Sequence, residues 1–269
     1  MAKSSNQLEK QIRKRLKKRT RKSKTPILLM SHMVLGHPSL EENAQVIDAM
    51  VKGGVDIMEL QIPFTEPYAD GPVIAAANQK ALDGGLRVDQ ALEFLANTTR
   101  KHAIPFLVMT YCNIMLARGI KRFVDEVADR GGVGLIIPDL PLEEAQEAIE
   151  ACNRRGLAWV QLMTPTCPDQ RLAELGQAAS GFCYVVARKG VTGKQTSFGD
   201  ELDTLLARCR KATTSPLAVG FGVRSAEDVA FLAGRADIAV VGTASIQIHE
   251  QHGVAAVGKF FAGLRDLEG

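Results

Sequence analysis

Eight short apolar stretches alternate with amphipathic segments along most of the sequence, and this alternation restricts the fold more than any other feature. Short apolar runs bounded by turn residues are typical of buried strands, and apolar residues at helical spacing are typical of helices packed on them. Strands are expected at 27–30, 55–62, 104–109, 133–137, 158–162, 182–187, 217–220 and 238–241. Helices are expected at 40–52, 88–100, 120–130, 143–155, 169–178, 202–211, 226–232 and 254–267.

Eight strands, each followed by a helix, predict a single-domain (β/α)8 TIM barrel over residues 26–269. The helix ends agree with this phasing, because paired glycines at 53–54 and 131–132 follow two of the expected helices. An open, doubly wound sheet is the alternative. Such a sheet usually has a glycine-rich fingerprint after its first strand, and here that loop reads V-L-G-H-P-S.

Residues 1–25 form a basic N-terminal arm with 11 lysines and arginines and a single acid, Glu9. Leu8, Ile12 and Leu16 recur at helical spacing, so we interpret the arm as a solvated helix or a frayed tail. Contact with nucleic acid or an acidic partner is the alternative. The rest of the chain has 22 basic and 29 acidic side chains, and it provides no basic platform for such a partner.

The cysteines and the hydropathy pattern indicate the compartment. The 5 cysteines are scattered without C-x-x-C spacing, which favours reduced thiols over disulfides or a zinc site. No apolar run reaches the roughly 18 residues of a membrane span, and the N-terminus lacks the apolar region of a signal peptide. We therefore expect a cytoplasmic protein with no membrane association and no bound metal.

Two carboxylates fall where a barrel of this kind places its catalytic groups, at the C-terminal ends of the strands. Glu59 lies inside the apolar run 55–62. Asp70 lies in the following loop and is the first residue of the Asp-Gly-Pro sequence that opens a helix. Burial raises the pKa of a carboxyl group, which suits a residue that both gives and takes a proton. An exposed position or an ion pair remains the alternative for Glu59, although no lysine or arginine lies near it in the sequence.

Glycine-rich loops after the last two strands indicate an anion site. Gly-Phe-Gly at 220–222 follows the seventh strand, and Gly-Thr-Ala-Ser at 242–245 follows the eighth. Glycines let the backbone approach an anion closely, and the N–H groups at a helix N-terminus point toward it. These loops are the place where such barrels bind phosphate, so we expect a phosphate site there. Tight turns without a ligand are the alternative.

Several motifs, taken together and in order, resemble the tryptophan synthase alpha subunit family over about residues 27–267. They are M-E-L-Q-I-P-F-T-E-P-Y-A-D-G-P-V-I, G-H-P after the first strand, P-D-L-P after the fourth, Y-V-V-A-R-K-G-V-T-G after the sixth, and G-F-G and G-T-A-S at the end. The resemblance implies a (β/α)8 barrel that cleaves indole-3-glycerol phosphate into indole and glyceraldehyde 3-phosphate. It implies no cofactor for this subunit, and a beta subunit as partner in an alpha2beta2 assembly.

The resemblance also implies roles for individual residues. Glu59 matches the general acid/base, and Asp70 matches the carboxylate that pairs with the indole N–H. Thr192 matches a lid hydroxyl that orients the aspartate, and Tyr184 matches a pocket tyrosine. The positions that match phosphate-binding residues are Gly193, Phe221, Gly222, Gly242 and Thr243. The positions that match the lining of the indole pocket are His32, Ile74, Met109 and Ile136.

Some residues depart from the family pattern. His32 stands where the family has a pocket phenylalanine, and His37 stands where it has an aspartate. Glu66 and Tyr68 change the loop after the second strand, and Gln61 replaces a small residue. The changes at His37, Glu66 and Tyr68 fall in the region that contacts the beta subunit in the family. They raise the alternative of a lyase that releases indole without a beta subunit.

Two further alternatives remain at this point. Lys189 near the end of the sixth strand would suit a Schiff-base aldolase, but it lies beside Arg188 in a loop rather than on an apolar wall. A catalytically weak allosteric or scaffold subunit is the other alternative. The presence of both carboxylates and of the glycine-rich loops argues against it.

Overall fold

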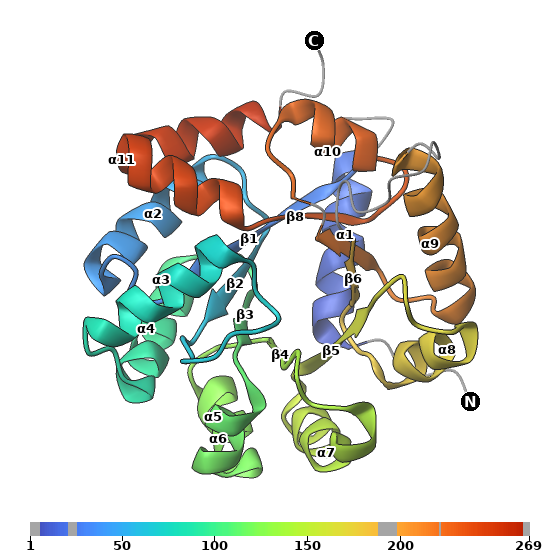
Figure 1. The fold of residues 1–269 in the computed structure, drawn as a ribbon, viewed down its shortest axis with the longest axis horizontal. Helices are drawn as coiled ribbons and strands as arrows, with labels where there is room; N and C mark the ends of the chain where they lie inside the picture. The colour runs from blue at the N-terminus through green and yellow to red at the C-terminus, as the bar shows by residue number, and fades with distance from the viewer. Residues whose placement is uncertain (1–5, 21–25, 188–197, 221, 266–269) are drawn as a thin grey trace.

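The structure is a computed structural model that describes residues 6–20, 26–187, 198–220 and 222–265. Eight parallel strands form a closed barrel in which each strand pairs with its neighbours in the sequence and β8 pairs with β1 (Figure 1). The strands are β1 (Leu28–Val34), β2 (Ile57–Gln61), β3 (Phe106–Met109), β4 (Gly134–Ile136), β5 (Ala158–Met163), β6 (Cys183–Val186), β7 (Leu217–Gly220) and β8 (Ile238–Val241). The predicted TIM barrel is therefore confirmed.

A ring of helices surrounds the barrel (Figure 1). It contains α2 (Leu40–Lys52), α3 (Pro72–Asp83), α4 (Val88–Lys101), α5 (Cys112–Arg118), α6 (Ile120–Asp129), α7 (Gln146–Arg155), α8 (Asp169–Ala178), α9 (Phe198–Ala212), α10 (Ala226–Leu232) and α11 (Thr243–Gly263). Within the described ranges, no helix has the length and apolar character needed to cross a membrane.

The helices differ from the expected ranges in several places, among them α3, which those ranges do not include, and the start of α9. The apolar pattern does not predict α5, which is short and buries only Met115. The segment expected as one helix at 143–155 is divided into a 3-10 turn, Leu142–Glu144, and α7. The last helix begins at Thr243 rather than at 254, because Gly253 has a left-handed backbone (φ 76°) that interrupts α11 and shifts the phase of its apolar face.

Side chains alternate between two layers of the core. Leu28 and Met30 of β1 join the cluster inside the barrel, whereas Leu29 and Met33 pack outward under the helices. This alternation follows from the pleat of a strand, in which successive side chains point to opposite faces. Interior side chains near the C-terminal ends of the strands therefore face the C-terminal opening of the barrel, which we call the mouth. A ligand can reach polar groups there.

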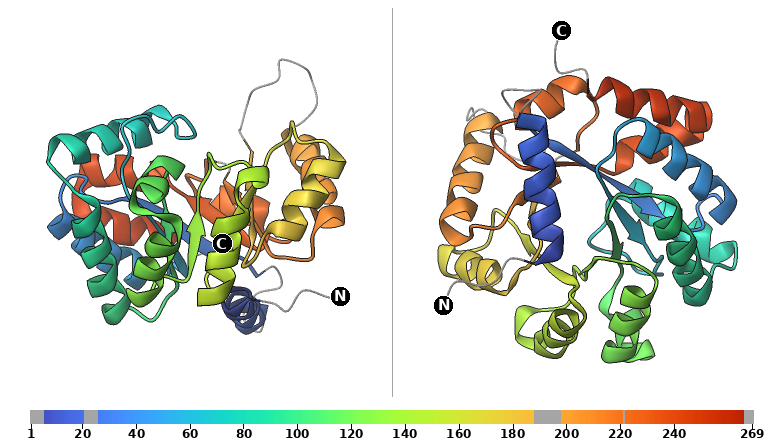
Figure 2. Two further views of the ribbon diagram at one scale, coloured as in Figure 1. Left: turned by 90° about the horizontal axis from the view of Figure 1, so that it is seen from below. Right: turned by 180° about the vertical axis from the view of Figure 1, so that it is seen from behind.

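The N-terminal helix α1 (Gln7–Thr20) lies at the opposite end of the barrel from the long loops (Figure 2). Leu8 and Ile12 are 1% and 0% exposed, and they belong to the same interior cluster as Leu28 and Ile57. The helix expected in the arm is therefore present over residues 7–20, but the expectation that it is free in solvent is wrong. The apolar stripe of α1 is buried because it covers the N-terminal opening of the barrel.

Several cations of α1 bind the barrel itself. Arg15 donates a hydrogen bond of 3.0 Å to the carbonyl oxygen of Ala103, and Arg19 forms an ion pair of 2.7 Å with the buried Asp56. Arg13 donates to the carbonyl oxygen of Thr214 at 2.7 Å. Part of the basic character of the arm therefore has a structural use within the chain.

Replacing Ile12 with alanine should lower the free energy of unfolding by about 2–5 kcal/mol, the usual cost of truncating a fully buried isoleucine. Alanine favours the helix, so the loss would report packing against the barrel rather than helix propensity. Urea unfolding followed by circular dichroism measures the change. The matched control, Lys14→Ala on the exposed face of α1, should stay within about 0.5 kcal/mol of the wild type. Equal stability of I12A and wild type would contradict the docking of α1.

Candidate active site

Glu59 lies in the middle of β2 with its side chain inside the barrel, where it is 3% exposed. In the strand register, Glu59 is opposite His32 on β1 and Leu107 on β3. Its Oε2 atom is buried and has no hydrogen-bond partner among the described residues. The sequence therefore places a carboxylate in the barrel interior with one oxygen not engaged by those residues.

Asp70 is held at the same mouth by two hydrogen bonds. The Nε2 atom of Gln61, at the end of β2, donates to Asp70 Oδ2 at 2.8 Å, and the hydroxyl of Tyr111 donates to the same oxygen at 3.0 Å. The backbone N–H of Ala69 donates to the hydroxyl oxygen of Tyr111 at 3.1 Å. The loop after β2 is thus fixed to the end of β3 through Tyr111.

Tyr111 is a site residue that the sequence reading missed. It lies two residues after β3, is fully buried, and stacks on Phe64 with ring centroids 5.2 Å apart. A tyrosine two residues beyond the end of an apolar strand was the available signal, because the C-terminal ends of barrel strands carry site residues. Gln61 had been noted as a departure from the family pattern but not as a partner of Asp70.

The environment of Asp70 changes its titration. Burial raises the pKa of Asp70 above its ordinary value, although the positive charge of His32 and the hydrogen bonds from Gln61 and Tyr111 act in the opposite direction. The negative charge of Glu59 adds to the increase. The two carboxylates are therefore close enough to influence each other, as the expected acid–base pair requires.

Tyr184 on β6 packs against the cluster inside the barrel. Burial raises its pKa well above the ordinary tyrosine value, and the charges of Glu59 and Asp70 raise it further. A phenol with a raised pKa stays protonated, so Tyr184 can donate a hydrogen bond but does not act as a base near neutral pH. Gly220 on β7 lies against its ring, because a Cβ at Gly220 would come within 2.7 Å of Tyr184 Cε1.

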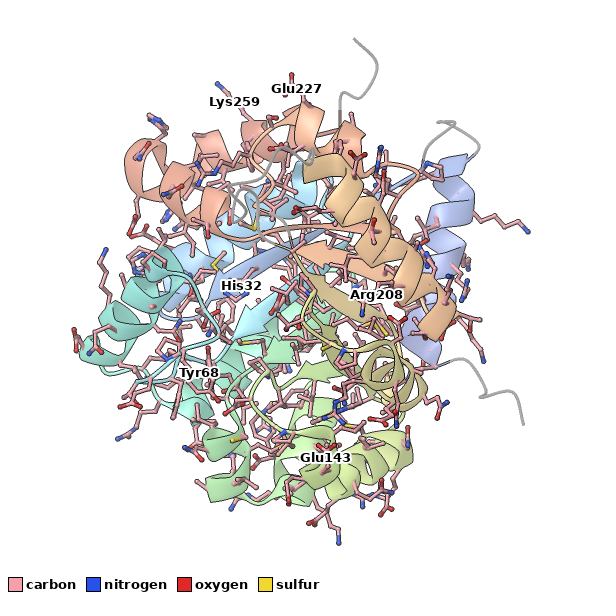
Figure 3. All side chains as sticks on the ribbon, turned by 45° about the vertical axis from the view of Figure 1, so that its right-hand side comes forward. His32, Tyr68, Glu143, Arg208, Glu227 and Lys259 are labelled. Carbon is pink, nitrogen blue, oxygen red and sulfur yellow. The ribbon has the colours of Figure 1, made fainter. Side chains whose placement is uncertain are left out.

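His32 lies closer to the centre of the molecule than Tyr68 does (Figure 3). The distance from His32 Nδ1 to Glu59 Oε1 is 3.4 Å, and both side chains are buried. Burial alone lowers the pKa of His32, but the negative charge of Glu59 and its close contact with the ring raise it above the ordinary histidine value. A partner for the ion-pair alternative of Glu59 is therefore present, and it is a histidine that carries a charge only when protonated.

The residues expected to line an indole pocket come from four elements. Met109 and Ile136 are register neighbours on β3 and β4, and both belong to the interior cluster. Ile74 on α3 is partly buried and packs in a separate small cluster with residues of β1 and α11. A Cβ at Gly242 would lie 3.6 Å from both His32 Cβ and Ile74 Cδ1, so these three residues meet at the mouth.

The expected phosphate positions are described in part. Gly222 has a left-handed backbone (φ 83°), and Gly242 is the N-cap of α11, with Thr243 as the first helical residue. The first turn of α11 has no acidic residue and no side-chain cap, whereas α10 is capped by Ser225 and has acids in its first turn. The N-terminus of α11 is therefore the better anion site of the two. Thr192, Gly193 and Phe221 lie outside the described residues, as does Lys189.

Three departures from the family pattern lie around the mouth. His37 Nε2 is 3.1 Å from Glu250 Oε1 on α11, and burial lowers the pKa of His37. Tyr68 is 73% exposed, with its ring 5.6 Å from that of Tyr111, and Glu66 is also exposed. In the described part of the chain, no group of three or more His, Cys, Asp or Glu side chains is arranged to hold a metal ion.

Comparison with known proteins identifies the family. The profile of the family described as "Tryptophan synthase alpha chain" matches residues 16–259. The tryptophan synthase alpha chain of Desulforapulum autotrophicum is 49% identical over 246 residues, which are 91% of this chain and 97% of that protein. The chain belongs to the tryptophan synthase alpha chain family. Accordingly, it is a lyase of tryptophan biosynthesis that cleaves indole-3-glycerol phosphate.

Other members of the tryptophan synthase alpha chain family agree with this assignment. The alpha chain of Desulfotalea psychrophila is 47% identical and covers 92% of this chain and 97% of its own length. A structure of Mycobacterium tuberculosis tryptophan synthase matches with a TM-score of 0.86 and 30% identity, over 97% of both chains. Tryptophan synthase subunit alpha from Legionella pneumophila matches with a TM-score of 0.85 and 28% identity, over 98% of both chains.

Replacing Asp70 with asparagine should stabilise the protein at neutral pH. The folded-state pKa of Asp70 is raised, so its ionised form opposes folding above the ordinary carboxyl pKa of 3.8. The gain from D70N should shrink as pH falls through the raised pKa and disappear below the ordinary one. Urea unfolding at a series of pH values measures it, with Asp83→Asn on α3 as the exposed control. A D70N protein less stable than wild type at neutral pH would show that the two hydrogen bonds outweigh the burial of the charge.

Proposed function

We propose that Glu59 and Asp70 carry out the cleavage of indole-3-glycerol phosphate. Glu59 acts as the general acid/base toward indole C3 and the glycerol hydroxyl, and Asp70 pairs with the indole N–H. The observation that carries this proposal is that β2 holds both carboxylates: Glu59 lies on it, 3.4 Å from His32, and Gln61 at its end donates a hydrogen bond of 2.8 Å to Asp70. Tyr184 and Thr192 are supporting residues in this proposal.

The chemistry needs a group that both supplies and removes a proton. Protonation of indole C3 makes the ring an electron sink, and the bond from C3 to the glycerol side chain then breaks with its electron pair returning to the ring. The glycerol hydroxyl loses its proton as the aldehyde forms. A carboxylate close to both atoms can perform both transfers, and a second carboxylate at the ring N–H stabilises the positive charge of the intermediate.

The substrate phosphate is proposed to bind at the N-terminus of α11 and at the loop after β7. Gly222, Gly242 and Thr243 contribute to this site, and Gly193 and Phe221 complete it. The support is the uncapped first turn of α11 and the close approach of Gly242 to His32 and Ile74. The apolar part of the pocket is proposed to consist of Ile74, Met109 and Ile136, with His32 at its polar edge.

A beta subunit is the proposed protein partner. Among the described residues, Tyr68 and Leu116 are the exposed large hydrophobic side chains, and both lie on elements that follow barrel strands toward the mouth. The alternative of a lyase that releases indole alone rests on the changes at His37, Glu66 and Tyr68. Indole release measured with and without a beta subunit distinguishes the two.

The remaining assignments concern the arm and the compartment. We propose that residues 26–269 are the catalytic barrel. We also propose that the arm, residues 1–25, stabilises the N-terminal end of the barrel and does not bind nucleic acid. The arginines of α1 that bind the barrel support this use. A cytoplasmic location is proposed from the scattered cysteines, which indicate reduced thiols.

Glu59→Gln should lower indole production by about 10²–10⁴-fold, the usual contribution of a general acid/base. Glutamine has nearly the same shape as glutamate but cannot exchange a proton, so near-UV circular dichroism should be unchanged. Indole release from indole-3-glycerol phosphate measures the loss. Glu93→Gln on the exposed face of α4 is the matched control and should retain wild-type activity. Substantial turnover by a folded E59Q protein would refute the role of Glu59.

Thr243→Glu should raise KM for indole-3-glycerol phosphate by about tenfold or more while kcat changes less. A carboxylate in the first turn of α11 would repel the phosphate, and a tenfold change corresponds to about 1.4 kcal/mol of binding. Steady-state kinetics measure the two parameters. Gln251→Glu adds the same charge at an exposed position farther along α11 and should leave KM unchanged. If both variants have the wild-type KM, the phosphate lies elsewhere.

A further inference from the structure

His32 and Glu59 form a buried pair at the centre of the site. They are opposite each other in the β1–β2 register, with 3.4 Å between Nδ1 and Oε1 and side chains that are 6% and 5% exposed. Within the described part of the chain, no ion pair joins Glu59 to a lysine or an arginine. An ionised carboxylate buried without a cation is costly, so the imidazole is the group that can balance the charge of Glu59.

The surroundings favour a proton on this pair. Burial lowers the pKa of His32, but the charges of Glu59 and Asp70 raise it, and the same two charges raise the pKa of Tyr184 on β6. On the helix side, His37 and His249 line a cavity of about 10 Å³ together with His32, and each contacts a glutamate on a surface helix. The charged groups that face His32 from the barrel side are acids, and they favour the protonated form of its imidazole.

A packing role alone explains an imidazole poorly at this position. The preceding interior residue on β1, Met30, and its register partner on β8, Val240, are apolar members of the interior cluster. An apolar side chain would fill the same space without the cost of burying a polar ring. The imidazole therefore needs a compensating interaction, and the contact with Glu59 supplies it.

We propose that His32 is a positioning residue that orients Glu59 and holds the proton that Glu59 transfers during cleavage. This inference rests on the proposed role of Glu59 and adds a residue to it. A proton passes from the pair to indole C3, and the bond from C3 to the glycerol carbon breaks with its electrons returning to the ring. The hydroxyl proton then moves to Glu59, which restores one proton to the pair. No other reactant is consumed.

The first test is the pH profile of indole release by His32→Gln and His32→Phe. In the wild type, kcat should fall as pH rises through the raised pKa of His32, above the ordinary value of 6.5, because the pair then loses its shared proton. In both variants kcat should no longer fall over this pH range, and it should be about 10- to 100-fold lower than in the wild type. Removal of a general acid/base itself costs up to about 10⁴-fold. KM should change less than kcat.

The matched control is His102→Gln. His102 also pairs with a carboxylate, at 3.0 Å from Asp48, and its side chain is 11% exposed, but this pair lies on the outer helices away from the mouth. H102Q should keep the wild-type kcat and pH profile. Thermal unfolding identifies any His32 variant that does not fold. Because glutamine is polar and phenylalanine is apolar, the test can use whichever of the two variants folds.

The second test does not depend on activity. In protein with ¹⁵N-labelled histidine, the ring nitrogens of His32 should titrate above the ordinary value in the wild type. In Glu59→Gln they should titrate below it, because burial then acts with less opposition. Asp70→Asn should lower the pKa of His32 by a smaller amount. An unchanged pKa of His32 in E59Q would overturn the pairing.

The outcomes separate the two proposals. An active E59Q protein refutes the proposed function and this inference with it. An inactive E59Q protein together with a His32→Gln variant that keeps the wild-type kcat and pH profile leaves the proposed function in place and refutes only the role of His32. Loss of the alkaline limb in both His32 variants, with a lowered His32 pKa in E59Q, supports both.

Discussion

The site depends on two carboxylates, the buried Glu59 in the middle of β2 and the partly buried Asp70 in the loop that follows it. Glu59 is enclosed by the barrel, and Asp70 is drawn toward it by Gln61 and Tyr111 rather than by a basic side chain. Amide and phenol donors stabilise a carboxylate without neutralising it. The charge therefore remains available to a substrate, and its cost is met by the rest of the fold.

The two ends of the barrel have different roles: residues at the N-terminal end stabilise the fold, and residues at the C-terminal end form the site. At the N-terminal end, α1 closes the interior with Leu8 and Ile12, and the buried Asp56 is paired with Arg19 and Arg265. The two arginines thus neutralise the charge of Asp56 within the chain. At the C-terminal end, the acids face polar donors and a histidine, and the first turn of α11 is uncapped. Only the second arrangement leaves electrostatic potential for a ligand, as expected for this architecture.

Periodicity was enough to predict the barrel but not the contacts at its mouth. All eight strands and most helices could be located because each buries a regular apolar face. The helix α5 is too short to show a pattern, and α11 changes phase at Gly253. The docking of α1 was missed because its charge suggested solvent, although Leu8 and Ile12 carried the right spacing.

Individual site residues were predictable where a backbone rule applied to them. Glu59 and Gly242 could be placed because strand ends and helix starts have fixed directions in a barrel. The contacts of Tyr111 with Asp70 and of His32 with Glu59 could not, because they depend on which neighbouring strand lies opposite, and register is a three-dimensional property. His32 had been recognised as a departure from a phenylalanine. Only its position opposite Glu59 gives that substitution a chemical consequence, since it places a titrating cation where the family has an apolar ring.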